Sequence, residues 1–423
     1  MVICIAAFRA IRSPSDHRGV DGTVNRVGDG SLLRKVNQSA ILEIIREHGP
    51  ISRSEIARLL HISPATVTRI VTELLEAQVI QEKGARLAPF GRRPILLEFN
   101  PRASLIIGVY VHRDMIGAIS DLNGEIFRRM VQPARPGEAG IQQLIALIRA
   151  LYDMARGYGL PVRGVGIGAP SIVLYREGVV AWAPSLGWRN VPLKALVEQA
   201  VELPVFVENE VNLIALGESW RGAGRDVDNL VCISLGAGIG AGIVLSGFLY
   251  RGAHCAAGEI GYLLPGTQYL GHPYEGFGCL EGIAGSTGIV QRAQAQLAAG
   301  RPSVLRKWLE KEEAQLTAEM VLLAAREGDA CACQVVDEVA DYLALAVASI
   351  SCVLDPHRII FSGDLVEFAD MFVERIATRL RNALPATPEL VVSQLGTDAA
   401  VLGALAMALF ETDEGVFVQK VQA

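Results

Sequence analysis

The chain has 423 residues, enough for two or three domains with sizeable cores, and its net charge is −6 at pH 7. Residues 1–102 contain 15 Lys/Arg against 10 Asp/Glu, whereas the remainder is acidic. An acidic whole argues against unspecific binding to nucleic acid, while a basic front end fits a local contact with DNA. Seven scattered cysteines without a C-x-x-C spacing argue against a disulfide framework and predict a reducing, cytoplasmic location.

The front of the chain divides into a tail and a small domain. Residues 1–30 mix Gly, Asp, Arg and Ser without periodicity, which predicts a flexible tail. Within residues 31–100, Ser52 and Glu55 form an S-x-x-E capping box that predicts a helix start, and Ser63-Pro64 predicts a second start. Strands are expected at 79–82 and 94–99. This order of helix, turn, helix and wing is typical of a winged helix-turn-helix, which reads DNA.

The second helix of this pair has a buried stripe and, opposite it, a face of short or hydrogen-bonding side chains. Such side chains suit a helix that enters the major groove, and arginines at the wing tip suit phosphates or a narrow minor groove. The predicted DNA-binding residues are Ser63, Ala65, Thr66, Thr68, Arg69, Arg92 and Arg93. A small helical bundle without a DNA role is the alternative, and the coincidence of caps, turn, exposed face and basic wing disfavours it.

From residue 101 onward, apolar strands alternate with amphipathic helices, including a single helix expected near 282–299. Two such units imply an α/β protein with two lobes and a cleft between them. Residues 229–250 carry no charge and are long enough to cross a membrane, but the run is rich in glycine. A buried strand, a glycine turn and a second strand fit this run better than a spanning helix, so no membrane partner is expected.

Four motifs together carry a resemblance to a known family: GRRP at 91–94, LGAGIGAGIVLSGFLYRG at 235–252, GEIGY at 258–262 and GCLEG at 278–282. With them the chain resembles the ROK family of repressors, open reading frames and kinases, above all its xylose-repressor type. The resemblance implies an actin-like, two-lobed sugar kinase fold of the ribonuclease H-like class over residues 101–423. The expected smaller lobe comprises about 101–225 and 395–412, and the larger lobe about 226–394.

The resemblance also implies a kinase site, of which this chain keeps only part. In family kinases a D-x-G-G-T loop follows the first strand of the kinase domain; here Tyr110 replaces the aspartate and the glycine pair is missing. Glu210 stands at the family's catalytic base position but is one methylene longer than aspartate, so no catalytic residue is predicted. The second glycine loop, 235–242, is either a phosphate turn or a hairpin that the fold requires. Loss of the first loop favours the hairpin, and ATP is not expected as a cofactor.

Carboxylate and amide groups at the family's sugar-gripping positions suit the hydroxyls of a sugar. The residues that the resemblance places there are Asn209, Glu210, Glu259, Tyr262 and Glu281, with Asn190 as a further candidate. For any one of them alone, a surface or helix-capping role is the alternative. Tyr262 replaces a family histidine that also binds zinc, and of the zinc cysteines only Cys279 is present, so no metal is predicted.

These features predict a sugar-responsive transcriptional regulator, a repressor of carbohydrate genes whose degenerate kinase domain senses the effector. Its expected partners are double-stranded operator DNA, a sugar or sugar derivative, and a second copy of the chain in a homodimer or higher homo-oligomer. One alternative is an ATP-dependent sugar kinase with an appended DNA-binding domain. Another is a DNA-binding protein whose relic kinase domain serves only for dimerisation. Turnover of ATP with sugars distinguishes the first alternative, and the absence of any thermal shift with sugars distinguishes the second.

Overall fold

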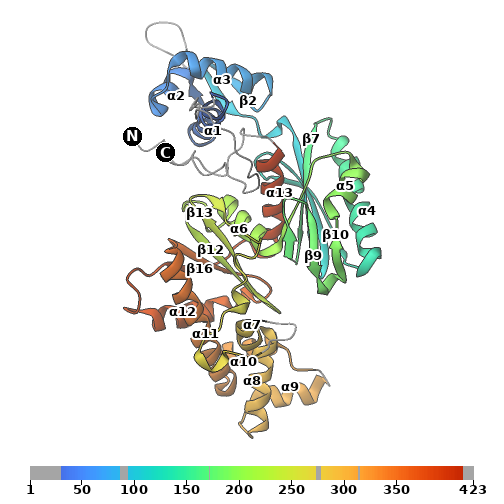
Figure 1. The fold of residues 1–423 in the computed structure, drawn as a ribbon, viewed down its shortest axis with the longest axis vertical. Coiled ribbons are helices and arrows are strands. Elements are labelled where there is room, and N and C mark those ends of the chain that lie inside the picture. The colour runs from blue at the N-terminus through green and yellow to red at the C-terminus, as the bar shows by residue number, and fades with distance from the viewer. Residues whose placement is uncertain (1–29, 86–93, 171, 273–277, 313–314, 413–423) are drawn as a thin grey trace, which may run out of the picture.

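The computed structural model describes residues 30–85, 94–170, 172–272, 278–312 and 315–412. An N-terminal helical domain lies at one end of an elongated molecule, followed by two lobes that each contain a sheet (Figure 1). The expected tail lies outside the described residues, except that Gly30 already begins the first helix.

The N-terminal domain contains helices α1 (Gly30–His48), α2 (Arg53–Leu60) and α3 (Pro64–Glu76). Both expected caps are confirmed. The Ser52 hydroxyl accepts from the Glu55 N–H while Glu55 accepts from the Ser52 N–H, and Ser63 caps α3 with Pro64 as its first residue. His61 ends α2 in the left-handed conformation, which turns the chain towards α3.

A three-stranded sheet completes this domain. Strands β2 (Ile80–Ala85) and β3 (Ile95–Phe99) pair antiparallel, as expected for a wing, and the short β1 (Ile51–Ser52) pairs with the other edge of β3. The apolar face of α3 and Leu97 of β3 share one core with α1. The fold of a winged helix-turn-helix is therefore confirmed. Arg92 and Arg93 lie outside the described residues.

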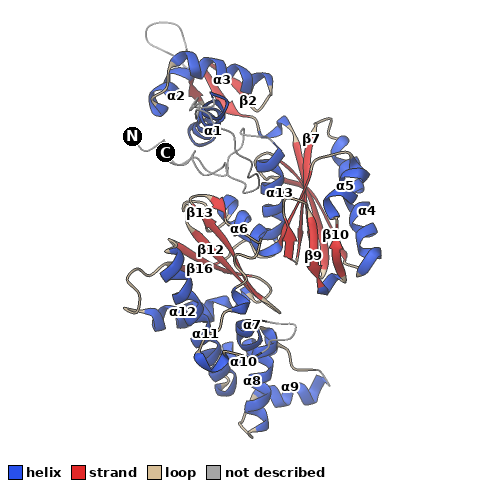
Figure 2. Ribbon diagram, in the orientation of Figure 1, coloured by secondary structure: helices blue, strands red, loops and turns tan. Residues whose placement is uncertain are grey.

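The smaller lobe is built on a mixed five-stranded sheet of order β11-β7-β4-β5-β6 (Figure 2). Its strands are β4 (Leu105–Val111), β5 (Asp114–Asp121), β6 (Ile126–Pro133), β7 (Val162–Ala169) and β11 (Val205–Asn209). Helices α4 (Gly137–Arg156) and α5 (Leu193–Val201) pack with one apolar cluster of this sheet. Helix α13 (Asp398–Thr412) returns from the chain end to pack on β4 and β7. A Cβ at Gly166 would lie 1.9 Å from the Ala404 carbonyl oxygen, so glycine permits this close approach.

A second, small sheet in this lobe was not predicted. It consists of β8 (Ile172–Leu174), β9 (Val179–Ala183) and β10 (Trp188–Val191), paired antiparallel in the order β10-β9-β8. Trp188 anchors it, because its ring is buried and its indole N–H donates to the Gly137 carbonyl at 3.0 Å.

The larger lobe has a sheet of order β14-β13-β12-β15-β16. Its strands are β12 (Leu230–Leu235), β13 (Ile239–Leu245), β14 (Phe248–Leu249), β15 (Arg358–Ser362) and β16 (Glu389–Val392). The expected hairpin at the glycine-rich run is confirmed by the antiparallel pairing of β12 with β13. Among the described residues, none of the helices is long and apolar enough to cross a membrane.

Helices cover one end of this lobe: α9 (Val304–Glu312), α10 (Ala318–Arg326), α11 (Ala330–Leu354) and α12 (Ala369–Leu380). The single helix expected near 282–299 is wrong, because the structure has α7 (Cys279–Ala284) and α8 (Ser286–Ala298) there. Gly285 is extended and separates them, and a Cβ at Gly285 would lie 2.6 Å from the Glu281 carbonyl oxygen.

Helix α6 (Glu210–Arg221) joins the parts of the molecule. It packs along α13, contacts β12 and β13 of the larger lobe, and its residues 212–220 are buried. One apolar cluster contains Ile41 and Ile45 of α1 together with Trp220 of α6 and Leu405 of α13. The predicted fold class, an α/β protein with a winged helix-turn-helix before two lobes, is confirmed.

Candidate DNA-binding face and ligand site

Helix α3 presents the predicted DNA-reading face to solvent. Ala65, Thr68 and Arg69 are exposed, whereas Val67 and Ile70 on the other side are fully buried. The Thr68 hydroxyl donates to the Pro64 carbonyl at 2.8 Å, and the hydroxyls of Ser63 and Thr66 lie 2.8 Å apart. These bonds fix the hydroxyl positions at the start of α3 and leave their oxygen lone pairs facing outward.

The N-terminus of α6 holds two of the predicted sugar ligands. Asn209 is the N-cap: its side-chain oxygen accepts from the N–H groups of Val211 at 2.8 Å and Asn212 at 3.3 Å. The capping alternative therefore applies to this oxygen. Glu210 follows as the first helical residue, where a carboxylate is favoured by the helix dipole.

Glu210 contacts Tyr110, the residue that replaces the aspartate of the family's first phosphate loop. The Tyr110 hydroxyl donates to a Glu210 carboxylate oxygen at 2.8 Å, and the Tyr110 ring stacks on His112. Burial raises the pKa of Glu210, against the opposing effects of His112 and of the Tyr110 hydrogen bond. A base that must take a proton from a substrate hydroxyl is here already a hydrogen-bond acceptor for a side chain of the protein.

A carboxylate that was not predicted as a site residue, Asp364, lies at the same place. It follows β15 and raises the pKa values of both Tyr110 and Glu210 through its negative charge, after the larger effect of burial. A Cβ at Gly236 would lie 3.2 Å from an Asp364 carboxylate oxygen, so this negative charge lies beside the second glycine loop. That charge disfavours phosphate there. Its position at the carboxyl end of a strand is the sequence signal that marks it.

Glu259 and Glu281 form the other group of candidates. Partial burial raises the pKa of Glu259, and the Glu281 charge raises it further, so the two carboxylates are neighbours. Glu281 accepts from the N–H groups of Gly278 at 2.7 Å and Ile239 at 3.2 Å, which ties the start of α7 to β13. Its carboxylate thus serves the fold as well as the candidate site.

The candidates meet around strand β13. Val211, next to Glu210, packs on the backbone of Gly240, and the Gly258 carbonyl accepts from the Ala241 N–H at 2.7 Å. The N-terminal end of α6 and the segment with Glu259 therefore both lie beside β13. Tyr262 has 56% of its surface exposed at the rim. Asn190 is exposed on β10, in the left-handed conformation, and no contact given by the described residues joins it to the others.

The side chains at the family's zinc-binding positions are not suited to bind a zinc ion. Cys279 is buried as the first residue of α7, whereas Tyr262 is exposed and has no nitrogen to offer. Within the described residues, no group of three or more His, Cys, Asp or Glu side chains could hold a metal ion. The nearby loop is instead packed by Tyr269, whose hydroxyl lies 3.1 Å from that of Tyr342 on α11.

A second feature missed by sequence reasoning joins the two lobes beside the candidate site. Glu208 of β11 is 2% exposed and accepts from the Arg251 guanidinium at 2.6 Å, and that guanidinium lies 3.7 Å from the ring centre of Tyr175. Desolvation lowers the pKa of Arg251, but Glu208 and Tyr175 together raise it above the usual value. The residues lie far apart in sequence, so no local pattern marks them.

Residues 107–411 match the model of the ROK family, which is most of the chain. The chain belongs to the ROK family. Residues 35–83 match the model of the MarR family, over the helix-turn-helix described above. A ROK body behind a helix-turn-helix makes this chain a ROK family transcriptional regulator.

Three ROK relatives show how the likeness is distributed. The chain is 31% identical over 391 residues to a protein named Xylose repressor from Caldicellulosiruptor bescii, which covers 90% of this chain and 98% of the relative. It is 37% identical over 246 residues to a Glucokinase from Halalkalibacterium halodurans, which covers 57% of this chain and 74% of that enzyme. A solved ROK family transcriptional regulator, described as a homolog of the E. coli MLC protein, matches with a TM-score of 0.78 and 27% identity over 90% of this chain and 97% of its own.

Proposed function

We propose that this ROK regulator is a repressor of carbohydrate genes whose body binds a sugar beside β13 and thereby changes operator affinity. The observation that carries this is the pairing of an exposed, capped α3 face with a kinase base position occupied by Tyr110. A chain of this kind keeps its DNA reader intact and has its phosphoryl-transfer site blocked. The full-length likeness to a protein named Xylose repressor supports the same function, and a pentose or hexose is the class of effector it suggests.

The proposed sugar contacts are Glu259, Glu281, the free surface of Tyr262 and the α6 N-terminus with Asn209 and Glu210. Carboxylate oxygens accept from vicinal hydroxyls, and an aromatic rim covers the apolar face of a sugar ring. Asn190 is the outlying member of the set. Because a ligand shifts an equilibrium only by its differential affinity, the sugar must contact the two lobes differently in the DNA-bound and released states.

The test begins with operator selection. The full chain is used to select duplexes from a random DNA pool, and the affinity for the selected duplex is then measured across a panel of pentoses, hexoses and their phosphates. One sugar is expected to change the operator dissociation constant severalfold, and Glu259→Gln is expected to remove that response while leaving sugar-free DNA binding intact. Arg189→Gln, an exposed change on β10, is the control. No response to any sugar would contradict the effector proposal.

The likeness to a glucokinase keeps one further function testable. A kinase with an appended DNA-binding domain would release ADP with a sugar, and this release would be lost in Glu210→Ala. We expect no turnover above the ATP background, because Tyr110 holds Glu210 and Asp364 faces the second glycine loop. Turnover that depends on Glu210 would make the chain an enzyme.

We further propose that the regulator binds DNA as a homodimer. Two-fold symmetric dimers are the commonest assemblies of soluble proteins and present two α3 helices to the half-sites of a palindrome. The chain mass is 45.3 kDa, so light scattering on the DNA-free protein should give twice that value. The duplexes selected from the random pool should contain inverted repeats. A monomer bound to a single half-site would contradict this assembly.

A further inference from the structure

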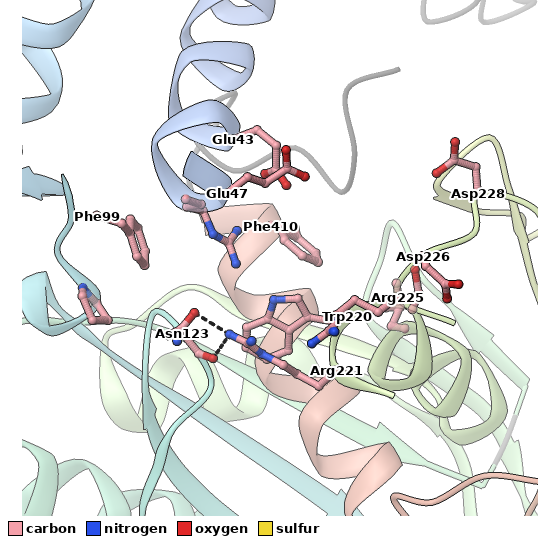
Figure 3. A pocket seen from close by; sticks show the side chains of 14 residues that line it. Glu43, Glu47, Phe99, Asn123, Trp220, Arg221, Arg225, Asp226, Asp228 and Phe410 are labelled. Atoms are coloured by element: carbon pink, nitrogen blue, oxygen red, sulfur yellow. Dashed lines mark hydrogen bonds between the residues drawn. The ribbon is translucent and has the colours of Figure 1, made fainter. Parts of the chain in front are cut away.

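A large cavity lies where the DNA-binding domain meets the ROK body (Figure 3). Its volume is about 930 Å³, and we call it the junction cavity. Arg46 of α1 lines it on the side of the DNA-binding domain, and Trp220 and Arg221, at the end of α6, line it on the side of the body. Phe410 of α13 packs edge-on against Trp220, with ring centres 6.3 Å apart. The candidate sugar site lies at the other end of α6.

Three guanidinium groups, those of Arg46, Arg221 and Arg225, gather in the junction cavity. Burial lowers the pKa of Arg221, and the charges of Arg46 and Arg225 lower it further, against the opposing charge of Asp121. Arg46 lies over the ring of Phe99 at 5.3 Å, and Arg221 donates to the neutral Asn123. Among the described residues, none of the three arginines forms an ion pair. Like charges gathered in partial burial without a direct ion pair are unfavourable, and a bound anion relieves the cost.

Two buried donors in the junction cavity also lack an acceptor. The indole N–H of Trp220, a side chain that is only 8% exposed, has no acceptor among the described residues, and neither has the Nε–H of Arg221. Each buried donor left unpaired costs about 1–3 kcal/mol. Figure 3 shows Trp220 and Arg221 next to each other at this cavity. The unpaired donors and the three arginines thus line the same cavity.

Four carboxylates also line the junction cavity, those of Glu43, Glu47, Asp226 and Asp228, but among the described residues none of them forms an ion pair with the three arginines. Asp226 is paired with Arg358 at 2.6 Å, and an oxygen of Asp121, which lies near Arg221, accepts from two backbone N–H groups. Glu43 and Glu47 flank Arg46 on α1 and raise its pKa against the larger effect of burial. Glu43 and Glu47 disfavour a DNA duplex in the junction cavity, because a duplex carries one negative charge per about 1.7 Å of its length. A small anion carries far less charge and is compatible with them.

We propose that the junction cavity is a binding site for a small phosphate-bearing anion held between the DNA-binding domain and the ROK body. A phosphate has acceptors for several guanidinium and indole N–H donors at once, and arginine is the side chain best matched to it. The volume admits an organic phosphate, whose remainder would lie against Trp220 and Phe410. Bound there, the anion bridges α1 to the end of α6 and stabilises one orientation of the DNA-binding domain.

The direct test is a titration of the full chain with inorganic phosphate at constant ionic strength, with sodium chloride as the balancing salt. Saturable quenching or enhancement of tryptophan fluorescence and a rise in the melting temperature are expected. Arg46→Gln and Arg225→Gln should each weaken binding about tenfold, and the double variant should abolish it. Trp220→Phe should remove the fluorescence response but keep the thermal shift. Arg189→Gln, on an exposed edge, should bind as the original chain does.

A second arm separates the sources of the phosphate. Glycerol phosphate and a hexose phosphate are titrated in the same way, and tighter binding than that of inorganic phosphate identifies an organic ligand. Binding that persists in the Arg46→Gln and Arg225→Gln double variant would place phosphate elsewhere, for example at the second glycine loop, and would overturn the proposal. So would a thermal shift that chloride alone reproduces.

The effect on DNA rests on the proposed function and is measured separately. Phosphate at saturation should change operator affinity in the original chain but not in the double variant with Arg46→Gln and Arg225→Gln. If operator affinity ignores every sugar while phosphate still binds at the arginines, the effector proposal fails and the anion site stands. If sugars act but phosphate never binds, the anion site fails alone.

Discussion

Tyr110 and Glu210 define the chemistry of the candidate site through one hydrogen bond. The two side chains lie 100 residues apart in the chain and meet at the point where β4 and α6 converge. Burial disfavours the charged form of Glu210, and the nearby negative charge of Asp364 adds to this, so the pKa of Glu210 lies above its usual value. A carboxyl group in this condition makes stability depend on pH in a defined direction.

We expect Glu210→Gln to stabilise the chain at high pH. Because the pKa of Glu210 is raised on folding, its contribution to stability is fully present below the unfolded pKa of about 4.3 and is lost as pH rises through the folded value. The melting temperature of the variant should therefore exceed that of the original chain at pH 8, and the difference should shrink towards pH 5. Glu374→Gln, an exposed change on α12, should show no such trend. A difference that is constant with pH would contradict the assignment.

Arg69 is expected to read bases, unlike the wing arginines. It is exposed on α3, a few residues after the Ser63 cap. From there a guanidinium can reach the major groove and donate hydrogen bonds to the edge of a guanine. Arg69→Ala should weaken binding to the selected duplex by about 1–3 kcal/mol and leave unspecific binding nearly unchanged. Arg92→Ala and Arg93→Ala should weaken both equally and reduce the slope of log affinity against log salt by about one unit each. Equal loss on all duplexes for Arg69→Ala would remove its reading role.

At the scale of elements, the caps of α2 and α3 show that neighbouring residues determine where the two helices of the helix-turn-helix begin. Ser52 and Glu55 satisfy each other's N–H groups at the start of α2, at 3.0 and 3.3 Å. The helix has only eight residues, too few to persist without its caps and its buried Ile56. The orientation of α3 against α2 therefore depends on groups that are visible in the sequence.

Removal of this cap should open α2 without unfolding the body. Ser52→Ala is expected to cost about 1 kcal/mol, which corresponds to roughly a fivefold fall in the hydrogen-exchange protection of α2 amides. Ser52→Thr keeps a hydroxyl and should restore most of the protection. Amides in α11 should be unaffected by either change. Equal protection in Ser52→Ala and the original chain would show that tertiary packing alone holds α2.

Elements with local signals were predictable, and those fixed by distant contacts were not. The caps at Ser52 and Ser63 and the β12–β13 hairpin need only neighbouring residues, and the sequence predicted them. Strands β8 to β10 were missed because each has three to five residues and forms only by pairing with the others. The break at Gly285 was missed because an isolated glycine is tolerated within a helix, and its tight contact with the Glu281 carbonyl is tertiary.

The residues of the candidate site also divide into those that sequence motifs indicated and those that only tertiary contacts reveal. The resemblance to the ROK family drew attention to Glu210 and Glu259, because they stand within motifs. The Tyr110 hydrogen bond, the approach of Asp364 to Gly236 and the arginines of the junction cavity come from segments that only folding brings together. Asn190 lies on a strand of the small sheet, and no contact among the described residues joins it to the other candidates. Its role in sugar binding stays a prediction.

For the whole molecule, α6 is an element that connects the candidate sugar site to the DNA-binding domain, and its Trp220 shares an apolar cluster with α1. It begins at the candidate sugar site, ends at the junction cavity, and is buried along its length between α13 and β13. A buried helix moves as a unit because packed interfaces hold discrete arrangements and do not deform continuously. We therefore expect a change at Glu210 to move Arg221, at the other end of α6.

The contact of Arg251 with Glu208 should set how firmly the two lobes are held around α6. Glu208 is almost fully buried and its oxygens accept from Asn212 at 3.0 Å and from Arg251 at 2.6 Å. Arg251→Gln would leave a buried carboxylate without its cation, a loss of about 3–5 kcal/mol in comparable cases. A fall in the melting temperature of roughly 6 °C or more is expected for a lobe of this size.

Arg326→Gln breaks an ion pair with Asp370 in which both side chains are well exposed, so it is the matched control and should cost under about 1 kcal/mol. Replacing both partners, with Arg251→Gln and Glu208→Gln together, should recover part of the loss, because no uncompensated charge then remains in the interior. Equal, small effects of Arg251→Gln and Arg326→Gln would mean that the lobes are held by apolar packing alone. In that case sugar binding must act through α6 without support from this ion pair, and Arg251→Gln should leave the sugar response of operator binding unchanged.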